Sequence, residues 1–414
     1  MFQRKIASFW LIPFLAWLVY ASAYLGRINL SVTIPYLQSE LGYSKASLGF
    51  LASGFFIFYA AGQLINGILG DRLKTKSFVS IGLLVAGISN IAVSYINSFP
   101  LMLFFWSLNG YFQSMLWGPL LRAISEAVPH DKQYQASFLM STSPVAGIFL
   151  AYILSGWFSV SFGWALAFRI PGIWLIIMSL VWYRGASESQ VMAKNSEAGA
   201  APPQAPPPFS AKELFNFIYQ SRLYLAILLG ILVGIVKEGL ILWSPSILNE
   251  LYFHDMAMML FIISLMPLVN FASVISGGIL YKKFHSDEQR VILLFLIITI
   301  LSAFLMWRLP ARVILINIIV YYVLMASLYA VNTMMMSYIP IRYRKSGRVS
   351  GAAGIVDSSI YLGAALAGPV IGAAAERFGW NGIFGGLLGI CILAVVIQML
   401  SMGYITSRNG MQVK

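Results

Sequence analysis

The chain has 414 residues, of which 59% are hydrophobic and only 10% are charged, and its mean hydropathy is +0.80. Soluble domains carry about 25% charged residues, so this composition excludes one apolar core inside a polar surface and indicates lipid-facing helices. The single cysteine, Cys391, excludes an intrachain disulfide and a thiolate metal cluster. The net charge of +13 lies in short loops between apolar runs, which argues against a nucleic-acid partner.

Twelve segments of the chain are apolar and long enough to cross a bilayer, which takes about 20 helical residues. The first half contains 7–35, 48–70, 77–96, 100–127, 134–159 and 164–183. The second half contains 223–249, 256–280, 290–308, 311–338, 349–375 and 380–405. We therefore predict an all-α membrane protein of twelve transmembrane helices, arranged as two six-helix bundles.

Residues 184–222 differ from the segments on either side, because they hold a proline-rich run at 201–208 and scattered charges. This composition predicts an extended, solvated linker between an N-terminal bundle, 1–183, and a C-terminal bundle, 223–414. Lysine and arginine gather in the loops on the side of both termini and the linker. The opposite set of loops holds only Lys45, Arg308, Arg312 and Arg377. The positive-inside rule then places both termini and the linker in the cytoplasm of a cell inner-membrane protein.

The two halves share short patterns in the same order. Arg27, followed eight residues later by a proline, matches Lys237 with the same proline spacing. The Phe-Gly-Trp run at 162–164 recurs at 378–380. Two parallel six-helix repeats predict pseudo-symmetric bundles, a site between them near the membrane midplane, and alternating access by rocking.

One loop and four helical motifs resemble a known family. The Gly-Ile-Leu-Gly-Asp-Arg-Leu-Lys-Thr-Lys run at 67–76 resembles the signature between the second and third helices of the major facilitator superfamily. The resemblance implies that Asp71 and Arg72 form a breakable latch with a gating role. The other motifs are Tyr20-x3-Tyr24-x2-Arg27-x-Asn29, Gly110-Tyr111-Phe112-Gln113-x3-Trp117-x-Pro119-x2-Arg122, Lys237-x-Gly239-x3-Trp243-Ser244-Pro245 and Gly354-x6-Tyr361-Leu362-Gly363.

These four motifs resemble the organophosphate:phosphate antiporters, which include the bacterial glycerol-3-phosphate and hexose-6-phosphate transporters. In that family two arginines clamp the phosphoryl group. Arg27 matches the first, whereas Lys237 keeps the charge of the second without its planar fork. The resemblance makes Tyr20 and Tyr24 substrate-lining residues. Two further lining positions depart from the family, so glycerol 3-phosphate itself is not assigned: Gln63 replaces a lysine and Ser143 replaces a histidine.

Ionisable residues inside membrane helices cost at least about 2.5–3.5 kcal/mol each, so each one needs a role. Arg27 and Lys237 are related by the repeat, and two uncompensated cations in a low-dielectric cavity would attract an anion. The alternative is that each cation pairs with a local acid. Glu238 is adjacent to Lys237, but neighbouring residues point about 100° apart on a helix, and we therefore favour anion binding.

The remaining charged residues have gating or coupling interpretations. Glu238 and Asp357 lie well inside predicted helices, and either one gates the transporter or carries a coupling proton. Arg122 and Glu126 are spaced i, i+4 and are predicted to form an ion pair with a gating role. Further lining candidates, each also consistent with helix packing, are Asn109, Gln113, Trp117, Ser141, Ser143, Asn332, Ser358 and Tyr361.

We expect no cofactor and no metal, because the three histidines lie in loops and no nucleotide-binding glycine loop is present. We predict a non-enzymatic secondary transporter that exchanges a phosphorylated metabolite for inorganic phosphate. Its partners are this small anion and the lipid bilayer, and the resemblance implies a monomer. Two alternatives stay open: a proton- or sodium-coupled symporter of organic carboxylates such as sugar acids, and a transporter-like sensor of sugar phosphates.

Overall fold

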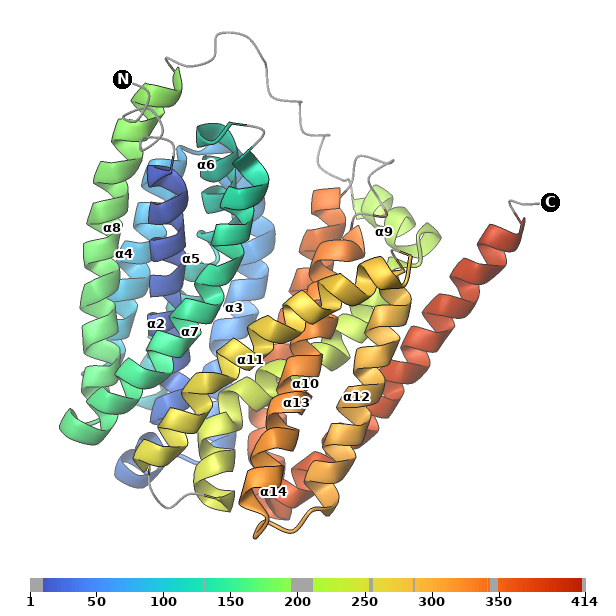
Figure 1. Ribbon diagram of the computed structural model, residues 1–414. Coiled ribbons are helices and arrows are strands. Elements are labelled where there is room, and N and C mark those ends of the chain that lie inside the picture. Colours follow the sequence, from blue (N-terminus) through green and yellow to red (C-terminus); the bar gives the residue numbers. More distant parts are fainter. Residues whose placement is uncertain are drawn as a thin grey trace. The chain divides into compact units, whose positions relative to one another are not determined.

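The computed structural model describes residues 10–129, 132–194, 211–252, 256–285, 287–340, 342 and 349–411. These residues are almost entirely helical, and none of the described residues belongs to a strand (Figure 1). The helices are α2 (Leu11–Leu41), α3 (Lys45–Arg72), α4 (Thr75–Val93), α5 (Phe99–Gln113), α6 (Trp117–Ala127), α7 (Gln133–Phe162), α8 (Trp164–Lys194), α9 (Ala211–Gln220), α10 (Leu223–Leu251), α11 (Met256–Lys283), α12 (Glu288–Arg308), α13 (Ile314–Thr333), the π-helical turn η2 (Met334–Tyr338) and α14 (Val349–Met411).

Ten helical stretches among the described residues are long and apolar enough to cross a membrane. One of them, Ala352–Met402, has 51 residues and bends at Gly379, so it supplies two crossings. α5 and α6 have 15 and 11 residues and are separated by a short break, and together they supply one more crossing. The predicted all-α fold of twelve transmembrane helices is thereby confirmed.

The segment predicted to be an extended linker is partly helical. α8 continues past residue 183 to Lys194, and α9 covers Ala211–Gln220. In α9, Phe217 and Ile218 pack on the apolar core that includes α10, while Phe215 and Tyr219 stack on each other and are exposed. The sequence prediction missed α9 because the proline-rich run dominates the composition of the segment. That run, 201–208, lies outside the described residues.

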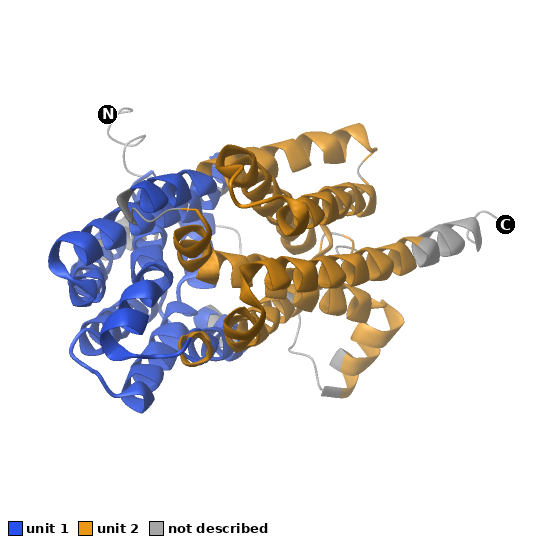
Figure 2. Cartoon of the chain, turned by 90° about the horizontal axis from the view of Figure 1, so that it is seen from below, with its two compact units in different colours: residues 1–44, 50–203, 255–267 blue, residues 45–49, 204–254, 268–414 orange. Residues whose placement is uncertain are grey.

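The chain divides into two compact units (Figure 2). Unit 1 comprises residues 1–44, 50–203 and 255–267, and unit 2 comprises residues 45–49, 204–254 and 268–414. Relative to the predicted bundles, the first residues of α3 group with unit 2 and the first part of α11 groups with unit 1.

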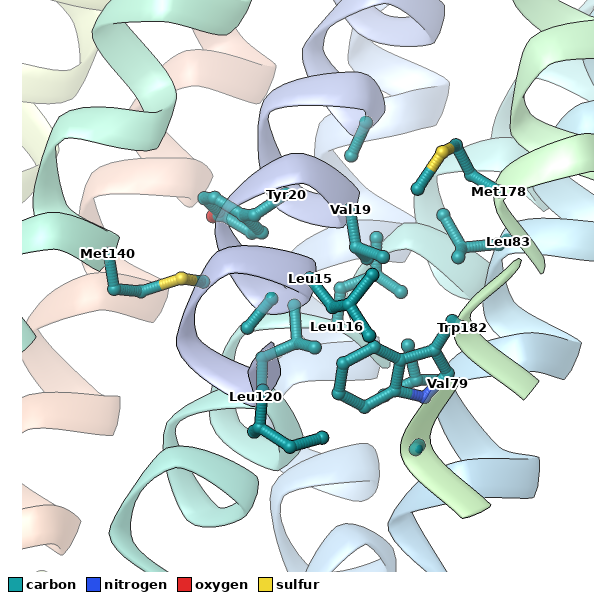
Figure 3. Packing of buried hydrophobic residues seen from close by; sticks show 14 of the residues in the cluster. Leu15, Val19, Tyr20, Val79, Leu83, Leu116, Leu120, Met140, Met178 and Trp182 are labelled. Carbon is teal, nitrogen blue, oxygen red and sulfur yellow. The ribbon is translucent and has the colours of Figure 1, made fainter. Parts of the chain in front are cut away.

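Unit 1 is packed around α2, which contacts α7 and α8 along much of its length. Its apolar core draws side chains from α2, α4, α6, α7 and α8, and Figure 3 shows Leu15, Val19 and Tyr20 of α2 at its centre. Trp182 of α8 is fully buried in the same cluster. This core fixes the N-terminal half of α2, whose next turns carry Arg27.

In unit 2, α10 packs against the first part of α14 at very short range. Gly230 and Gly234, one turn apart on α10, face α14, and a Cβ atom on Gly234 would lie 2.1 Å from the Ile360 carbonyl oxygen. Gly363 of α14 faces α10 in the same way. Small residues at such positions let membrane helices approach backbone to backbone. The equivalent contact in unit 1 is Gly147 of α7 against α2, which supports the internal repeat.

The repeated Phe-Gly-Trp motif has a backbone explanation. Gly163 has φ +89° and ψ 158°, and Gly379 has φ +66° and ψ 174°. This region of backbone space is open essentially to glycine alone. At both places the glycine separates two consecutive helical spans, so the same glycine-dependent turn recurs in the two halves of the chain.

Candidate functional site

Arg27 follows a kink in the middle of α2. The residue before it, Gly26, has φ −92° and ψ 15°, which interrupts the helical geometry. Three side-chain amides donate to the Gly26 carbonyl oxygen: Asn90 at 3.2 Å, Asn109 at 2.9 Å and Gln113 at 3.1 Å. A kink needs replacement partners for its backbone groups in a buried helix, and these amides supply them.

The amides at the kink belong to a larger buried network. Asn29 Nδ2 donates to Asn90 Oδ1 at 2.9 Å and to the Ala167 carbonyl oxygen at 3.1 Å. Gln113 Nε2 also donates to Asn109 Oδ1 at 3.0 Å. The side chains come from α2, α4 and α5, and all four are fully buried. Fully satisfied networks of this kind rigidify a core, so the backbone that carries Arg27 is held by α4 and α5 and, through Asn29, by α8.

The Arg27 guanidinium is held by aromatic rings and an amide. Its Nε donates to Gln113 Oε1 at 3.2 Å. Its central carbon lies 4.6 Å from the ring centre of Tyr59, 4.7 Å from that of Tyr24 and 5.4 Å from that of Phe55. Aromatic faces attract a guanidinium without neutralising its charge. Tyr59 and Phe55 lie on α3 and were missed by the sequence analysis, although their four-residue spacing marks one helix face.

The acids of the first half lie far from Arg27 along the chain. Between residues 1 and 203 they are Glu40, Asp71, Glu126, Asp131, Glu188 and Glu197. Glu40, Asp71 and Glu126 are each the second-last residue of their helix. Arg27 lies near the middle of α2, in a membrane-spanning stretch. A cation at this depth in a low-dielectric medium is a strong attractor for an anion.

Lys237 has a different environment. Its Nζ lies 2.7 Å from Glu238 Oε1 and 3.2 Å from Asn332 Oδ1, and it sits 5.0 Å from the ring centre of Tyr329. The two charged side chains are only 8% and 14% exposed. The expectation that helix geometry keeps Glu238 away from Lys237 is therefore wrong. Both side chains are long and flexible, so their charged ends meet although their Cα–Cβ bonds diverge.

Arg27 and Lys237, which the sequence predicts to be two equivalent cations, therefore have different surroundings. Arg27 is surrounded by aromatic rings and amides, whereas Lys237 contacts a carboxylate. The repeat-related position of Glu238 in the first half is Ile28, which is buried and apolar. The acid is therefore a feature of the second half alone and not a property of the repeat.

Three of the other predicted lining residues make packing or hydrogen-bond contacts in this structure, and their lining role stays a prediction. Tyr20 is buried in the core of unit 1, edge-on to Tyr24 and 4.7 Å from Trp117 between ring centres. Ser143 is fully buried, and its hydroxyl donates to the Met140 carbonyl oxygen of its own helix. Gln113 is also fully buried and orients Arg27. Gln63, Asp357 and Tyr361 are partly buried on α3 and α14.

The predicted ion pair between Arg122 and Glu126 is present, with 2.7 Å between Nε and Oε1. Arg122 also donates through Nη1 to the Gly70 carbonyl oxygen at 2.9 Å, which ties α6 to the end of α3. The side chains of Asp71 and Arg72, at that same end, lie outside what the structure describes. Their latch and the gating role of Arg122 stay predictions. Within the described ranges, no group of three His, Cys, Asp or Glu side chains could hold a metal ion.

Replacing Asn90 with leucine is expected to destabilise unit 1 by about 1–3 kcal/mol, because Asn29 and the Gly26 carbonyl each lose a buried partner. The measurement is thermal unfolding of the purified protein in detergent. Ser89→Ala is the matched control, since Ser89 is equally buried on the same helix and lies outside this network. An Asn90→Leu variant as stable as Ser89→Ala would contradict the network's role.

Comparisons with known proteins agree with this architecture. Residues 16–359 match the family model of the Major Facilitator Superfamily. A probable hexose phosphate transport protein of Chlamydia trachomatis is 25% identical over 407 residues, covering 91% of this chain and 87% of the relative. The glycerol-3-phosphate transporter of Bacillus subtilis is 26% identical over 401 residues, covering 92% and 89%. The resemblance to organophosphate:phosphate antiporters is thereby confirmed.

A solved structure with the same fold is that of a bacterial homolog of the human lysosomal transporter Spinster. It superposes with a TM-score of 0.73 and covers 94% of both chains at 16% sequence identity. At this identity the likeness concerns the arrangement of the helices and not the substrate.

Proposed function

Because this chain belongs to the Major Facilitator Superfamily, a family of membrane transporters and not of enzymes, we propose that it exchanges a small phosphorylated metabolite for inorganic phosphate by alternating access. The observation that carries the proposal is Arg27, a cation in the middle of a membrane helix, held by Gln113 and aromatic rings. The relatives named for hexose phosphate and glycerol-3-phosphate transport support a phosphorylated cargo. We place the protein in the inner membrane with both termini cytoplasmic.

The chemistry of recognition follows from the two repeat-related cations. Arg27 can offer its guanidinium to two phosphoryl oxygens at once, while Lys237 acts as a point charge. When an anion neutralises the net positive charge of these residues and Glu238, the energetic cost of moving this charge through the low-dielectric part of the cycle falls. The loaded carrier then changes conformation faster than the empty carrier, which is the physical basis of obligatory exchange.

Exchange in proteoliposomes tests the proposal. Vesicles are preloaded with phosphate, and labelled phosphate is offered outside together with a panel of sugar phosphates and sugar acids as competitors. We expect saturable phosphate uptake that depends on internal phosphate and is competed by a phosphorylated compound. Exchange by the purified protein would also exclude a purely sensory role. Vesicles that take up no phosphate under these conditions would overturn the antiport proposal.

A second candidate is a proton-coupled symporter of organic carboxylates. The contact between Glu238 and Lys237 favours it, because a carboxylate substrate that binds Lys237 would displace a buried acid, and a coupling proton would remove the charge of that acid. The discriminating measurement adds a protonophore while internal phosphate is held constant. Uptake of a sugar acid that collapses under this treatment supports the symporter, whereas unchanged phosphate exchange supports the antiporter.

A further inference from the structure

We propose that Glu238 is an intramolecular competitor for Lys237, so that the carrier binds its anion more tightly when the Glu238 carboxylate is removed from the ammonium. This inference rests on the proposed function, since it assumes that Lys237 recognises the anion. In the structure the Glu238 carboxylate lies 2.7 Å from the Lys237 ammonium, the distance of a charge-assisted hydrogen bond. A substrate oxygen that binds the same ammonium has to displace this carboxylate or share the lysine with it.

The second partner of Lys237 makes such an exchange of acceptors feasible. Asn332 of α13 accepts from the ammonium at 3.2 Å and is neutral, and the Tyr329 ring lies on the same helix. When the carboxylate leaves, the ammonium still has an amide oxygen and an aromatic face. Lys237 therefore stays in place as a cation while its capacity to bind an external anion is restored.

Under this proposal Arg27 in the first half of the chain and Lys237 in the second half have different roles. Arg27 has aromatic and amide neighbours and keeps its guanidinium charge, so it attracts an anion at any pH of interest. Glu238 places a competing negative charge beside Lys237. The repeat-related Ile28 cannot do this for Arg27.

The neighbouring helices carry further titratable groups, including Tyr329 on α13, and Asp357 and Tyr361 on α14, which packs against α10. Asp357 precedes Ser359, which faces Gly230, and Gly230 lies seven residues before Lys237 on α10. Asp357 is an acid inside a membrane-spanning stretch, so it is the alternative acidic competitor and serves as a control.

The test measures anion binding by the full-length protein in detergent through its shift in melting temperature, which grows with ligand concentration over dissociation constant. The probes are inorganic phosphate, glycerol 3-phosphate and glucose 6-phosphate across about pH 5 to 8. The variants are Glu238→Gln, Asp357→Asn and Glu250→Gln, alongside wild type. Glu250→Gln is the matched control, because Glu250 lies on the same helix and contacts Lys45 at the same 2.7 Å.

Glu238→Gln is expected to lower the dissociation constant about tenfold, because the ammonium no longer has a competing carboxylate. The ratio between variant and wild type, taken at each pH, cancels the protonation of the phosphate itself. Unchanged or weaker binding by Glu238→Gln, or an advantage seen with Asp357→Asn instead, would overturn the proposal. A purely structural pair would lower the melting temperature without ligand and leave the dissociation constant unchanged.

The binding data distinguish a failure of the competitor role of Glu238 from a failure of anion recognition. If wild type binds phosphate and Glu238→Gln binds it equally well at every pH, only the competitor role is wrong. If neither wild type nor Glu238→Gln binds any of the three anions, anion recognition itself is wrong and the proposed function fails with it.

Discussion

Replacing Arg27 with alanine is expected to reduce phosphate exchange at least about 100-fold. A charged hydrogen bond contributes about 1.5–3 kcal/mol, and loss of two of them to phosphoryl oxygens costs about 3 kcal/mol or more. Each 1.4 kcal/mol corresponds to a factor of ten in binding. The measurement is the initial rate of labelled phosphate uptake into phosphate-loaded proteoliposomes, with the amount of reconstituted protein determined for each variant.

Arg27→Lys separates charge from geometry in the same assay. The lysine keeps the positive charge but loses the planar fork and the Nε donor that binds Gln113. We expect about tenfold slower exchange, between wild type and the alanine variant. Exchange at the wild-type rate in Arg27→Ala, with the protein folded, would remove Arg27 from the substrate site and leave the family resemblance without its central residue.

The position of Arg27 was predictable from the sequence, but the means of holding it was not. An arginine between apolar residues is visible without a structure because its cost in a membrane demands a role. The Gly26 kink leaves no such signal, since glycines are frequent in membrane helices. Asn90 reaches the kink from α4, and no local pattern pairs it with α2.

The pairing of Lys237 shows a different limit of sequence reasoning. The argument that adjacent helical residues point apart concerns Cα–Cβ directions, and it predicts contacts well for short side chains. Lysine and glutamate place their charges several bonds from the backbone, so their charged ends can meet across the 100° that separates them. The observed 2.7 Å contact follows from this reach and from the scarcity of other polar groups in an apolar helix.

The motif Gly354-x6-Tyr361-Leu362-Gly363 contains two glycines whose importance the sequence does not distinguish. Gly354 and Gly363 belong to the same resemblance to the antiporter family and lie on the same helix, α14. The structure separates them. A Cβ atom on Gly354 would meet nothing within 4 Å, whereas one on Gly363 would lie 2.1 Å from the Ile231 carbonyl oxygen of α10. That contact is with backbone, which cannot rotate away as a flexible side chain can.

Gly363→Ala is therefore expected to destabilise the protein by about 1–3 kcal/mol or more, because α10 and α14 have to separate. Gly354→Ala is expected to be neutral or stabilising, since alanine is favoured over glycine within a helix by about 1 kcal/mol. Melting temperature and the yield of monodisperse protein in detergent distinguish the two. The same Cβ would lie 2.9 Å from the backbone nitrogen of Ile235, two residues before Lys237, so Gly363→Ala is also expected to weaken anion binding. Equal melting temperatures for the two variants would show that the close approach of these helices contributes little to stability.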